Sequence, residues 1–227
     1  MKIDTATCAI MGTEDVALSL LELPQAAAVL DLGCYKGLAS RALLTRGYQV
    51  SSCDLLEREG VEQLPNFRVV DANKPLPYKD KEFDGVLSTE VIEHLENPTQ
   101  FIRECSRILK DDGVFVLSTP DVNNIVARIT YLFSGEFPVF RPLHFFEWGH
   151  ISPVSYSWLA ATAQKYGFRI EAVASEKRPI GWKRKILSSF ILVPLHPLFR
   201  RQGHARNLKT TIILRLRKTS EIEVAVL

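Results

Sequence analysis

Short apolar runs that end in a polar residue or a glycine recur along the first half of the chain. Such runs are typical of strands buried on both faces of a parallel sheet. They predict strands over residues 28–32, 48–53, 67–70, 83–88 and 114–118. Two later runs, over residues 168–174 and 210–217, predict a sixth and a seventh strand.

Between these runs, apolar residues recur at the three- and four-residue spacing of helices. The clearest predicted helix begins at an Asn97 cap with Pro98 in its first turn and is closed by Gly113. The remaining predicted helices start at a Thr13 cap and run to about residue 23, cover residues 38–46 and about 122–133, and run from a Ser155 cap to about residue 166. Strict alternation of strand and helix predicts an α/β fold, a doubly wound parallel sheet with helices on both faces. The alternation loosens over residues 120–154, where we expect an aromatic-rich irregular stretch after the helix.

Two glycines, Gly33 and Gly37, separate the first predicted strand from the helix that follows it. A strand, a glycine turn and a helix form half of a nucleotide-binding unit. Phosphate-binding versions carry a third glycine or a Lys-Ser/Thr pair, and this chain has neither. Asp31, just before the turn, would repel a pyrophosphate and suits a positively charged ligand. These features point to S-adenosylmethionine, which carries an ammonium, a sulfonium and no phosphate.

The stretch Asp31-Leu32-Gly33-Cys34-Tyr35-Lys36-Gly37 resembles the first motif of class I S-adenosylmethionine-dependent methyltransferases. The likeness extends over about residues 26–217 and is closest to small-molecule enzymes similar to the ubiquinone-biosynthesis O-methyltransferases. It implies a Rossmann-like, seven-stranded, mostly parallel sheet whose seventh strand is antiparallel and lies beside the fifth. The departure is Tyr35, which replaces the usual middle glycine. A tyrosine is tolerated there if its φ is negative, or else it weakens cofactor binding.

The resemblance also assigns cofactor-binding residues to the ends of the predicted strands. Asp54 follows the second strand, 21 residues after Gly33, where an acid can hold both hydroxyls of a ribose; the alternative is a solvated strand end. Asp71 and Ala72 match the adenine-binding positions, with a loop cap as the alternative for Asp71. Glu93 and His94 match a stretch that is mostly structural in the family. The full predicted cofactor-binding set is Asp31, Gly33, Cys34, Tyr35, Gly37, Asp54, Leu55, Asp71, Ala72, Thr89 and Glu90.

The acceptor of the methyl group would meet residues 120–154. A base is needed only if the acceptor is protonated, and His144 and His150 are the predicted catalytic residues, with Glu147 as a further candidate. The aromatic residues Phe145, Phe146 and Trp148 predict an apolar acceptor pocket. The alternative is that they form the internal hydrophobic core of a lid.

Charge is distributed unevenly along the 227 residues. Residues 176–227 hold 12 Lys and Arg against 3 Asp and Glu, although the whole chain has a net charge of only +2. Within this region, residues 178–207 combine an apolar run with flanking cations, which suits an anionic membrane surface better than nucleic acid. Alternatively, residues 178–207 form a lid over the acceptor site, form a dimer interface or bind RNA. The sequence leaves the oligomeric state open.

The four cysteines show no Cys-x-x-Cys pairing and no histidine spacing suited to zinc, so we expect no metal site. No apolar signal core or spanning run is present, so we expect a cytoplasmic protein that attaches peripherally to membranes at most.

Together these patterns predict one domain over residues 1–227, with insertions at about 120–154 and 178–207. The predicted function is methyl transfer from S-adenosylmethionine to a small-molecule, lipid-linked or glycan-linked acceptor, on oxygen in preference. The alternative is a non-catalytic relative that binds a membrane or a partner through its basic insertion. A nicotinamide enzyme is a further alternative, against which the missing third glycine argues.

Overall fold

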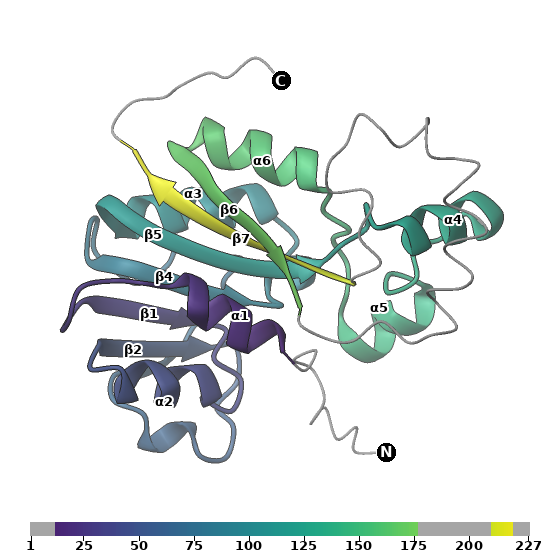
Figure 1. The fold of residues 1–227 in the computed structure, drawn as a ribbon. Coiled ribbons are helices and arrows are strands. Elements are labelled where there is room, and N and C mark those ends of the chain that lie inside the picture. Colours follow the sequence, from purple (N-terminus) through teal and green to yellow (C-terminus); the bar gives the residue numbers. More distant parts are fainter. Residues whose placement is uncertain (1–11, 177–209, 220–227) are drawn as a thin grey trace.

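The computed structural model describes residues 12–176 and 210–219 and centres on a seven-stranded sheet of order β3-β2-β1-β4-β5-β7-β6 (Figure 1). The strands are β1 (Ala28–Leu32), β2 (Gln49–Asp54), β3 (Phe67–Val69), β4 (Phe83–Thr89), β5 (Leu109–Pro120), β6 (Phe168–Ser175) and β7 (Thr211–Lys218). The first five pair in parallel, and β7 is antiparallel to both β5 and β6. The predicted α/β class, the strand count and the antiparallel seventh strand beside the fifth are all confirmed.

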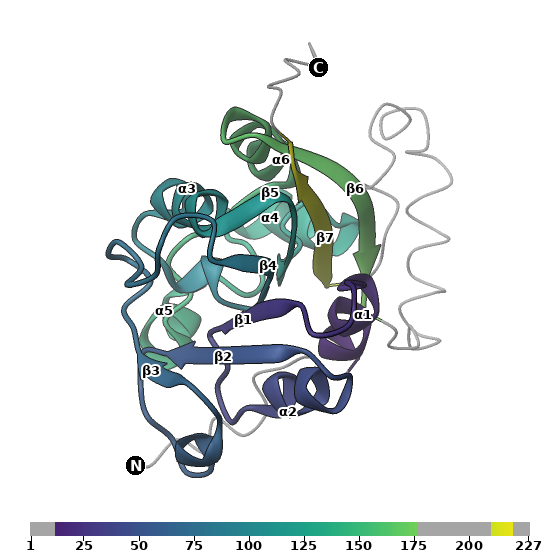
Figure 2. The same ribbon diagram turned by 90° about the vertical axis from the view of Figure 1, so that its left-hand side faces the viewer.

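Helices cover both faces of the sheet, as Figure 2 shows from the left-hand side of Figure 1. The helices are α1 (Thr13–Leu20), α2 (Leu38–Thr45), α3 (Pro98–Ile108), α4 (Ile125–Ser134), α5 (Pro142–Trp148) and α6 (Tyr156–Lys165), with short 3₁₀ turns η1 (Val61–Gln63) and η2 (Ile92–His94). α1 and α2 lie on one face, and α3 and α6 lie on the other. The chain winds outward in opposite directions from β1 and β4, so the switch point lies at their carboxyl ends.

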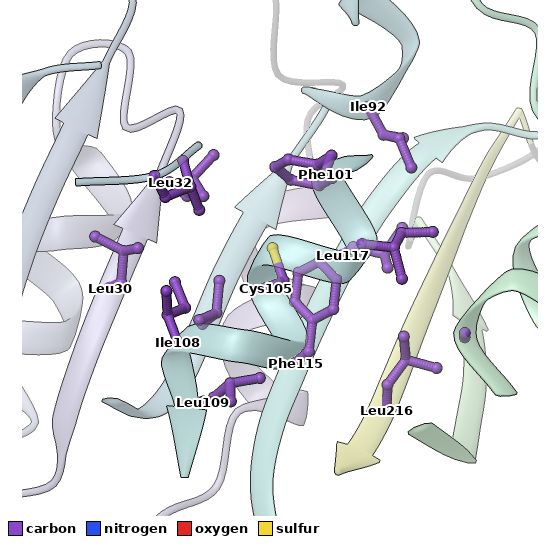
Figure 3. Packing of buried hydrophobic residues seen from close by; sticks show 14 of the residues in the cluster. Leu30, Leu32, Ile92, Phe101, Cys105, Ile108, Leu109, Phe115, Leu117 and Leu216 are labelled. Atoms are coloured by element: carbon purple, nitrogen blue, oxygen red, sulfur yellow. The ribbon is translucent and has the colours of Figure 1, made fainter. Parts of the chain in front are cut away.

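Two apolar clusters separate the faces because successive strand residues point to opposite sides. In β5, Phe115 and Leu117 pack toward α3 and α6, whereas Val114 and Val116 pack toward α1 and α2. Figure 3 shows the larger cluster, in which Phe115 meets Phe101 of α3 with their ring centroids 6.1 Å apart. Full burial of each such side chain contributes about 1.5–3 kcal/mol, so the sheet is held rigidly behind its carboxyl edge.

Several predicted boundaries were wrong. Gly113 does not close the helix that begins at the Asn97 cap: α3 ends at Ile108, and β5 begins at the next residue and contains Gly113. Thr13 is the first residue of α1 and not its cap, which is Gly12 with φ 92°, and α1 ends at Leu20. The caps predicted at Asn97 and Ser155 are confirmed, since their side chains accept hydrogen bonds from backbone N–H groups three residues later.

The region after β5 holds more regular structure than expected. α4 begins at an Asn124 cap, and α5 occupies part of the stretch predicted to be irregular. Figure 1 shows α4 and α5 beyond the end of the sheet to which β1 and β2 point. The other predicted insertion, residues 178–207, lies outside the described residues. Among the helices that are described, none has the length and apolar character needed to cross a bilayer.

Candidate functional site

The glycine turn after β1 is closed by short backbone hydrogen bonds. The N–H groups of Gly33 and Cys34 both donate to the carbonyl oxygen of Cys53, at 2.8 and 2.9 Å. Gly33 has φ 85°, and a Cβ at this position would lie 2.2 Å from Cγ2 of Val91. Glycine is therefore required both by the backbone conformation and by the side chain that packs over the turn.

Tyr35 has φ 49°, so the condition that its φ be negative is not met. The turn demands the left-handed conformation that the usual glycine would adopt freely, at a cost of about 1 kcal/mol or more for tyrosine. Two contacts hold the residue there. Its N–H donates to Oδ2 of Asp54 at 2.8 Å, and its ring lies 4.7 Å from the guanidinium carbon of Arg58.

Asp54 ends β2, as predicted, and its carboxylate accepts a hydrogen bond from the glycine turn. Its Oδ1 accepts hydrogen bonds from the N–H of Leu56 at 3.2 Å and from Nη1 of Arg58 at 2.5 Å. Its side chain is only 11% exposed. The ion pair with Arg58 was not predicted, although the four-residue spacing is visible in the sequence. A ribose that bound to Asp54 would share this carboxylate with Arg58.

Asp31 is buried in β1 rather than open to a ligand. Its Oδ2 accepts a 2.5 Å hydrogen bond from Oγ of Ser40 in α2. Burial, helped by the charge of Glu14, raises the pKa of Asp31 to about 7 despite this hydrogen bond. A cationic ligand nearby would favour the ionised form.

The predicted adenine-binding positions lie at the end of β3. Oδ1 of Asp71 accepts a hydrogen bond from the N–H of Asn73 at 3.0 Å, and its Oδ2 lies 3.3 Å from Nζ of Lys74. The loop-cap alternative for Asp71 is thus present in the structure, with the side chain 30% exposed. Leu55, 60% exposed, also stands open beside Asp54, while Ala72 packs partly against the core.

Carboxylates gather at the end of β4. Glu90 follows Thr89 with φ 54°, and its Oε1 accepts a 2.8 Å hydrogen bond from Oγ of Ser118 in β5. Burial raises the pKa of Glu90 to about 7, and it raises that of fully buried Glu93 well above the ordinary value, helped by the charge of Glu90. Oε2 of Glu93 accepts a hydrogen bond from Oγ1 of Thr119 at 3.1 Å.

Glu93 meets two histidines, a grouping that no sequence motif predicted. One ligand-type atom from each of Glu93, His94 and His150 lies within 4.8 Å of the others. His94 and Gly149, whose carbonyl oxygen lies 3.1 Å from Nδ1 of His94, are 55 positions apart in the sequence. Local motif spacing therefore gave no signal for this grouping.

The predicted catalytic residues lie around α5. Burial, helped by the nearby His94, lowers the pKa of His150 to about 4. His144 stacks edge-on against Trp148, with ring centroids 4.6 Å apart, while Glu147 is exposed. A general-base role for His144 or His150 stays a prediction.

The aromatic residues of α5 do not enclose a pocket. Phe145, Phe146 and Trp148 are 50%, 83% and 44% exposed. A cavity of about 480 Å³ lies instead beside α4, where Tyr131 and Phe137 contribute to its lining. Among the described residues, the apolar side chains of this region are therefore exposed.

The donor set at the carboxyl edge fits S-adenosylmethionine in its chemistry. Asp54 offers a carboxylate suited to vicinal hydroxyls, and the turn at Gly33 and Gly37 brings backbone close to it. Glu90 places an acidic group beside this edge, and Asp31 places another that is buried behind the turn; acidic groups there suit a cation and disfavour a phosphate. For the ribose hydroxyls to bind Asp54, the hydrogen bond between Asp54 and Arg58 must lengthen or break.

Comparison with known proteins agrees with a cofactor site at the carboxyl edge of the sheet. The family model described as a methyltransferase domain matches residues 12–173. A probable S-adenosylmethionine-dependent methyltransferase of Mycobacterium tuberculosis is 32% identical over 120 residues, 51% of this chain and 41% of its own length. A ubiquinone biosynthesis O-methyltransferase of Dechloromonas aromatica is 35% identical over 104 residues, 42% of this chain and 45% of its own.

Solved structures show the same fold. An S-adenosylmethionine-dependent methyltransferase from Mesorhizobium loti superposes with a TM-score of 0.61 at 16% identity, covering 90% of this chain and 96% of that one. The curated relatives are matched over less than half of their own length. The family model, by contrast, spans well over half of this chain, from α1 to β6. The chain belongs to the methyltransferase domain family.

Proposed function

We propose that the protein transfers a methyl group from S-adenosylmethionine to a small-molecule or lipid- or glycan-linked acceptor. The observation that carries this proposal is the position of Asp54, at the carboxyl end of β2 and hydrogen-bonded to the glycine turn. The names of the curated relatives, which include S-adenosylmethionine-dependent methyltransferases, support the choice of cofactor.

Each cofactor-facing residue has a separate task in this proposal. Asp54 holds the ribose hydroxyls, and the turn from Gly33 through Cys34 and Tyr35 to Gly37 passes close to the rest of the cofactor. Asp71 and Ala72 receive the adenine, and Thr89 and Glu90 border the site from the β4 side. When bound, S-adenosylmethionine supplies a sulfonium methyl group that is open to in-line displacement, so the protein mainly orients the reactants and excludes water.

An apolar acceptor suits the surface around α4 and α5. Large side chains are exposed there, namely Tyr131, Leu132, Phe133, Leu143, Phe145, Phe146 and Trp148. Exposed apolar groups in such number mark binding surfaces. The ubiquinone-biosynthesis relatives, named as O-methyltransferases, support oxygen as the methylated atom. We propose a cytoplasmic location, with residues 178–207 attaching the protein to anionic membranes.

A second candidate function is binding without catalysis, and it rests on Tyr35 and Arg58. Tyr35 holds a left-handed backbone in the glycine turn, and the guanidinium of Arg58 occupies Oδ1 of Asp54, the carboxylate that would bind the ribose. In that case the protein would bind a membrane or a partner through its basic region and leave the cofactor site unused.

Calorimetric titration with S-adenosylmethionine and its demethylated product separates the two functions. We expect micromolar binding by the unaltered protein and a loss of at least about 10-fold in Asp54→Ala, because two hydrogen bonds to a charged acceptor are removed. Asp111→Ala, an exposed aspartate at the opposite end of the sheet, is the matched control and should bind normally. No binding by the unaltered protein, with binding recovered in Arg58→Ala, would favour the non-catalytic function.

Two further assays address the acceptor and the membrane. Methyl transfer from labelled cofactor should appear in lipid and glycan hydroxyl acceptors, and its absence with every such acceptor would contradict O-methylation. Co-sedimentation should recover the full-length protein with anionic vesicles and not with neutral ones. Equal recovery in both supernatants would reject membrane attachment.

A further inference from the structure

The cavity of about 480 Å³ beside α4 lies close to the predicted cofactor site. Its volume falls in the range of about 300–1,000 Å³ that is typical of small-molecule sites. Val122, in its wall, follows Ser118 by four residues, a distance of at most about 14 Å along an extended chain. Ser118 donates a 2.8 Å hydrogen bond to Glu90, which borders the cofactor site. An elongated acceptor can therefore occupy the cavity at one end and meet the cofactor at the other.

The first turn of α4 holds one wall of the cavity in place. The Asn124 cap accepts a 2.9 Å hydrogen bond from the N–H of Ala127, which is itself 2% exposed. Residues three and four positions apart share one face of a helix. Arg128, Tyr131 and Leu132 have this spacing, and all three line the cavity. The anchored helix thus presents a cation, an aromatic ring and an aliphatic group to the same space.

Two aromatic rings form a flat part of the lining. Tyr131 and Phe137 stack with their ring centroids 4.6 Å apart and their planes 24° from parallel. Aromatic rings prefer offset stacking, so this pair offers a surface on which a further flat ring can lie. Val122, Leu132 and Pro153 add apolar groups to the same lining. The cavity therefore suits a flat apolar ring better than a sugar.

The charge of the lining is positive. Among the described residues that line the cavity, Arg128 is the one with a charged side chain, and none carries a carboxylate. A guanidinium has five N–H donors in a planar fork, so Arg128 can bind an oxyanion while it also contacts protein. The amide oxygen of Asn123 accepts a 2.8 Å hydrogen bond from the N–H of Tyr156, so the remaining polar group of this amide is an NH₂ donor. A cation and a neutral donor favour an anionic group on the ligand.

We propose that this cavity is a subsite for the methyl acceptor, and that the acceptor joins a flat apolar ring to one oxyanion, a carboxylate or a phosphate. Tyr131 and Phe137 stack on the ring, and Arg128 binds the oxyanion. An uncharged acceptor would gain little from Arg128, whereas an oxyanion gains charge-assisted hydrogen bonds, which is why we favour the anion. The identification of the bound molecule as the acceptor rests on the proposed methyl transfer, but the binding chemistry does not.

Two fluorescent dyes with the same rings test the site in the full-length protein, without S-adenosylmethionine. Anilinonaphthalene sulfonate carries one oxyanion, and phenylnaphthylamine lacks it. Arg128→Gln should weaken binding of the sulfonate dye by at least about 10-fold and change that of the neutral dye by less than about 2-fold. Phe137→Ala should weaken both dyes, because the ring loses a stacking partner. Arg103→Gln removes an exposed guanidinium of α3 outside the cavity, so this matched control should bind both dyes normally.

Competition then distinguishes the two kinds of oxyanion. Naphthoate and naphthyl phosphate should displace the sulfonate dye, and the one that does so at the lower concentration identifies the anion of the acceptor. Naphthol, which has the same rings without the charge, should displace it least.

Three results would overturn the proposal, with circular dichroism confirming that each variant is folded. They are an unchanged affinity for the sulfonate dye in Arg128→Gln, an equal loss for both dyes in that variant, and displacement by naphthol as strong as by the two anions. Absence of saturable binding of either dye by the unaltered protein would overturn it as well. None of these measurements needs the cofactor, so they leave the proposed methyl transfer to its own test.

Discussion

Replacing Gly33 with alanine tests the packing of the glycine turn most directly. The new Cβ would lie 2.2 Å from Cγ2 of Val91, in a residue whose φ is 85°. Left-handed backbone costs an alanine about 1–2 kcal/mol, and overpacking adds typically about 1–3 kcal/mol. We therefore expect Gly33→Ala to lower the free energy of unfolding by about 2–5 kcal/mol.

Two comparisons divide this cost between strain and overlap. Gly135 has φ 70°, and a Cβ added there would meet nothing within 4 Å, so Gly135→Ala should cost only about 1 kcal/mol, from strain alone. In a Val91→Ala background the nearest atom to the alanine at position 33 becomes Cβ of residue 91, at 3.6 Å, an ordinary contact. There Gly33→Ala should cost about as much as Gly135→Ala.

Urea unfolding followed by circular dichroism measures all of these variants under one set of conditions. The reasoning is refuted if Gly33→Ala costs no more than Gly135→Ala, or if its cost is the same with and without the Val91 side chain. Unchanged m-values across the series would show that the denatured state is not responsible.

Two ion-pair networks give further predictions. Arg107→Ala should destabilise the protein by about 3 kcal/mol in urea unfolding, because it leaves the buried carboxylate of Glu104 without its 2.7 Å partner; an unchanged midpoint would contradict this. Burial alone would raise the pKa of Glu171, but Arg217 and Arg215 outweigh it and hold the pKa at about 2. The stability that this group contributes is therefore present above pH about 4.5 and lost as the pH falls toward 2. Glu171→Gln should reduce the fall in the free energy of unfolding between pH 4.5 and pH 2. An unchanged fall in the variant would exclude Glu171 as its origin.

The family and the order of strands were predictable because their signals are local. Each buried parallel strand is a short apolar run, and each crossover helix shows its own periodicity, so alternation alone implied the doubly wound sheet. The methyltransferase resemblance, carried by Asp31, Gly33 and Gly37, is confirmed by the family model. Helix ends were less predictable, as at Gly113, because a strand that begins at once after a helix has no separating turn to mark it.

The environment of the site residues was not predictable from their positions in the chain. Asp54 was expected at the end of β2, but its pairing with Arg58 and the left-handed Tyr35 depend on how the turn folds back. Glu93 and His150 are distant in sequence and meet because the segment after α5 docks on η2. Sequence alone determined the sheet, the glycine turn and the family, since these depend on the chemistry of neighbouring residues. Only tertiary packing decided which charges are buried, paired or brought together, because desolvation and contact arise between segments that the chain order keeps apart.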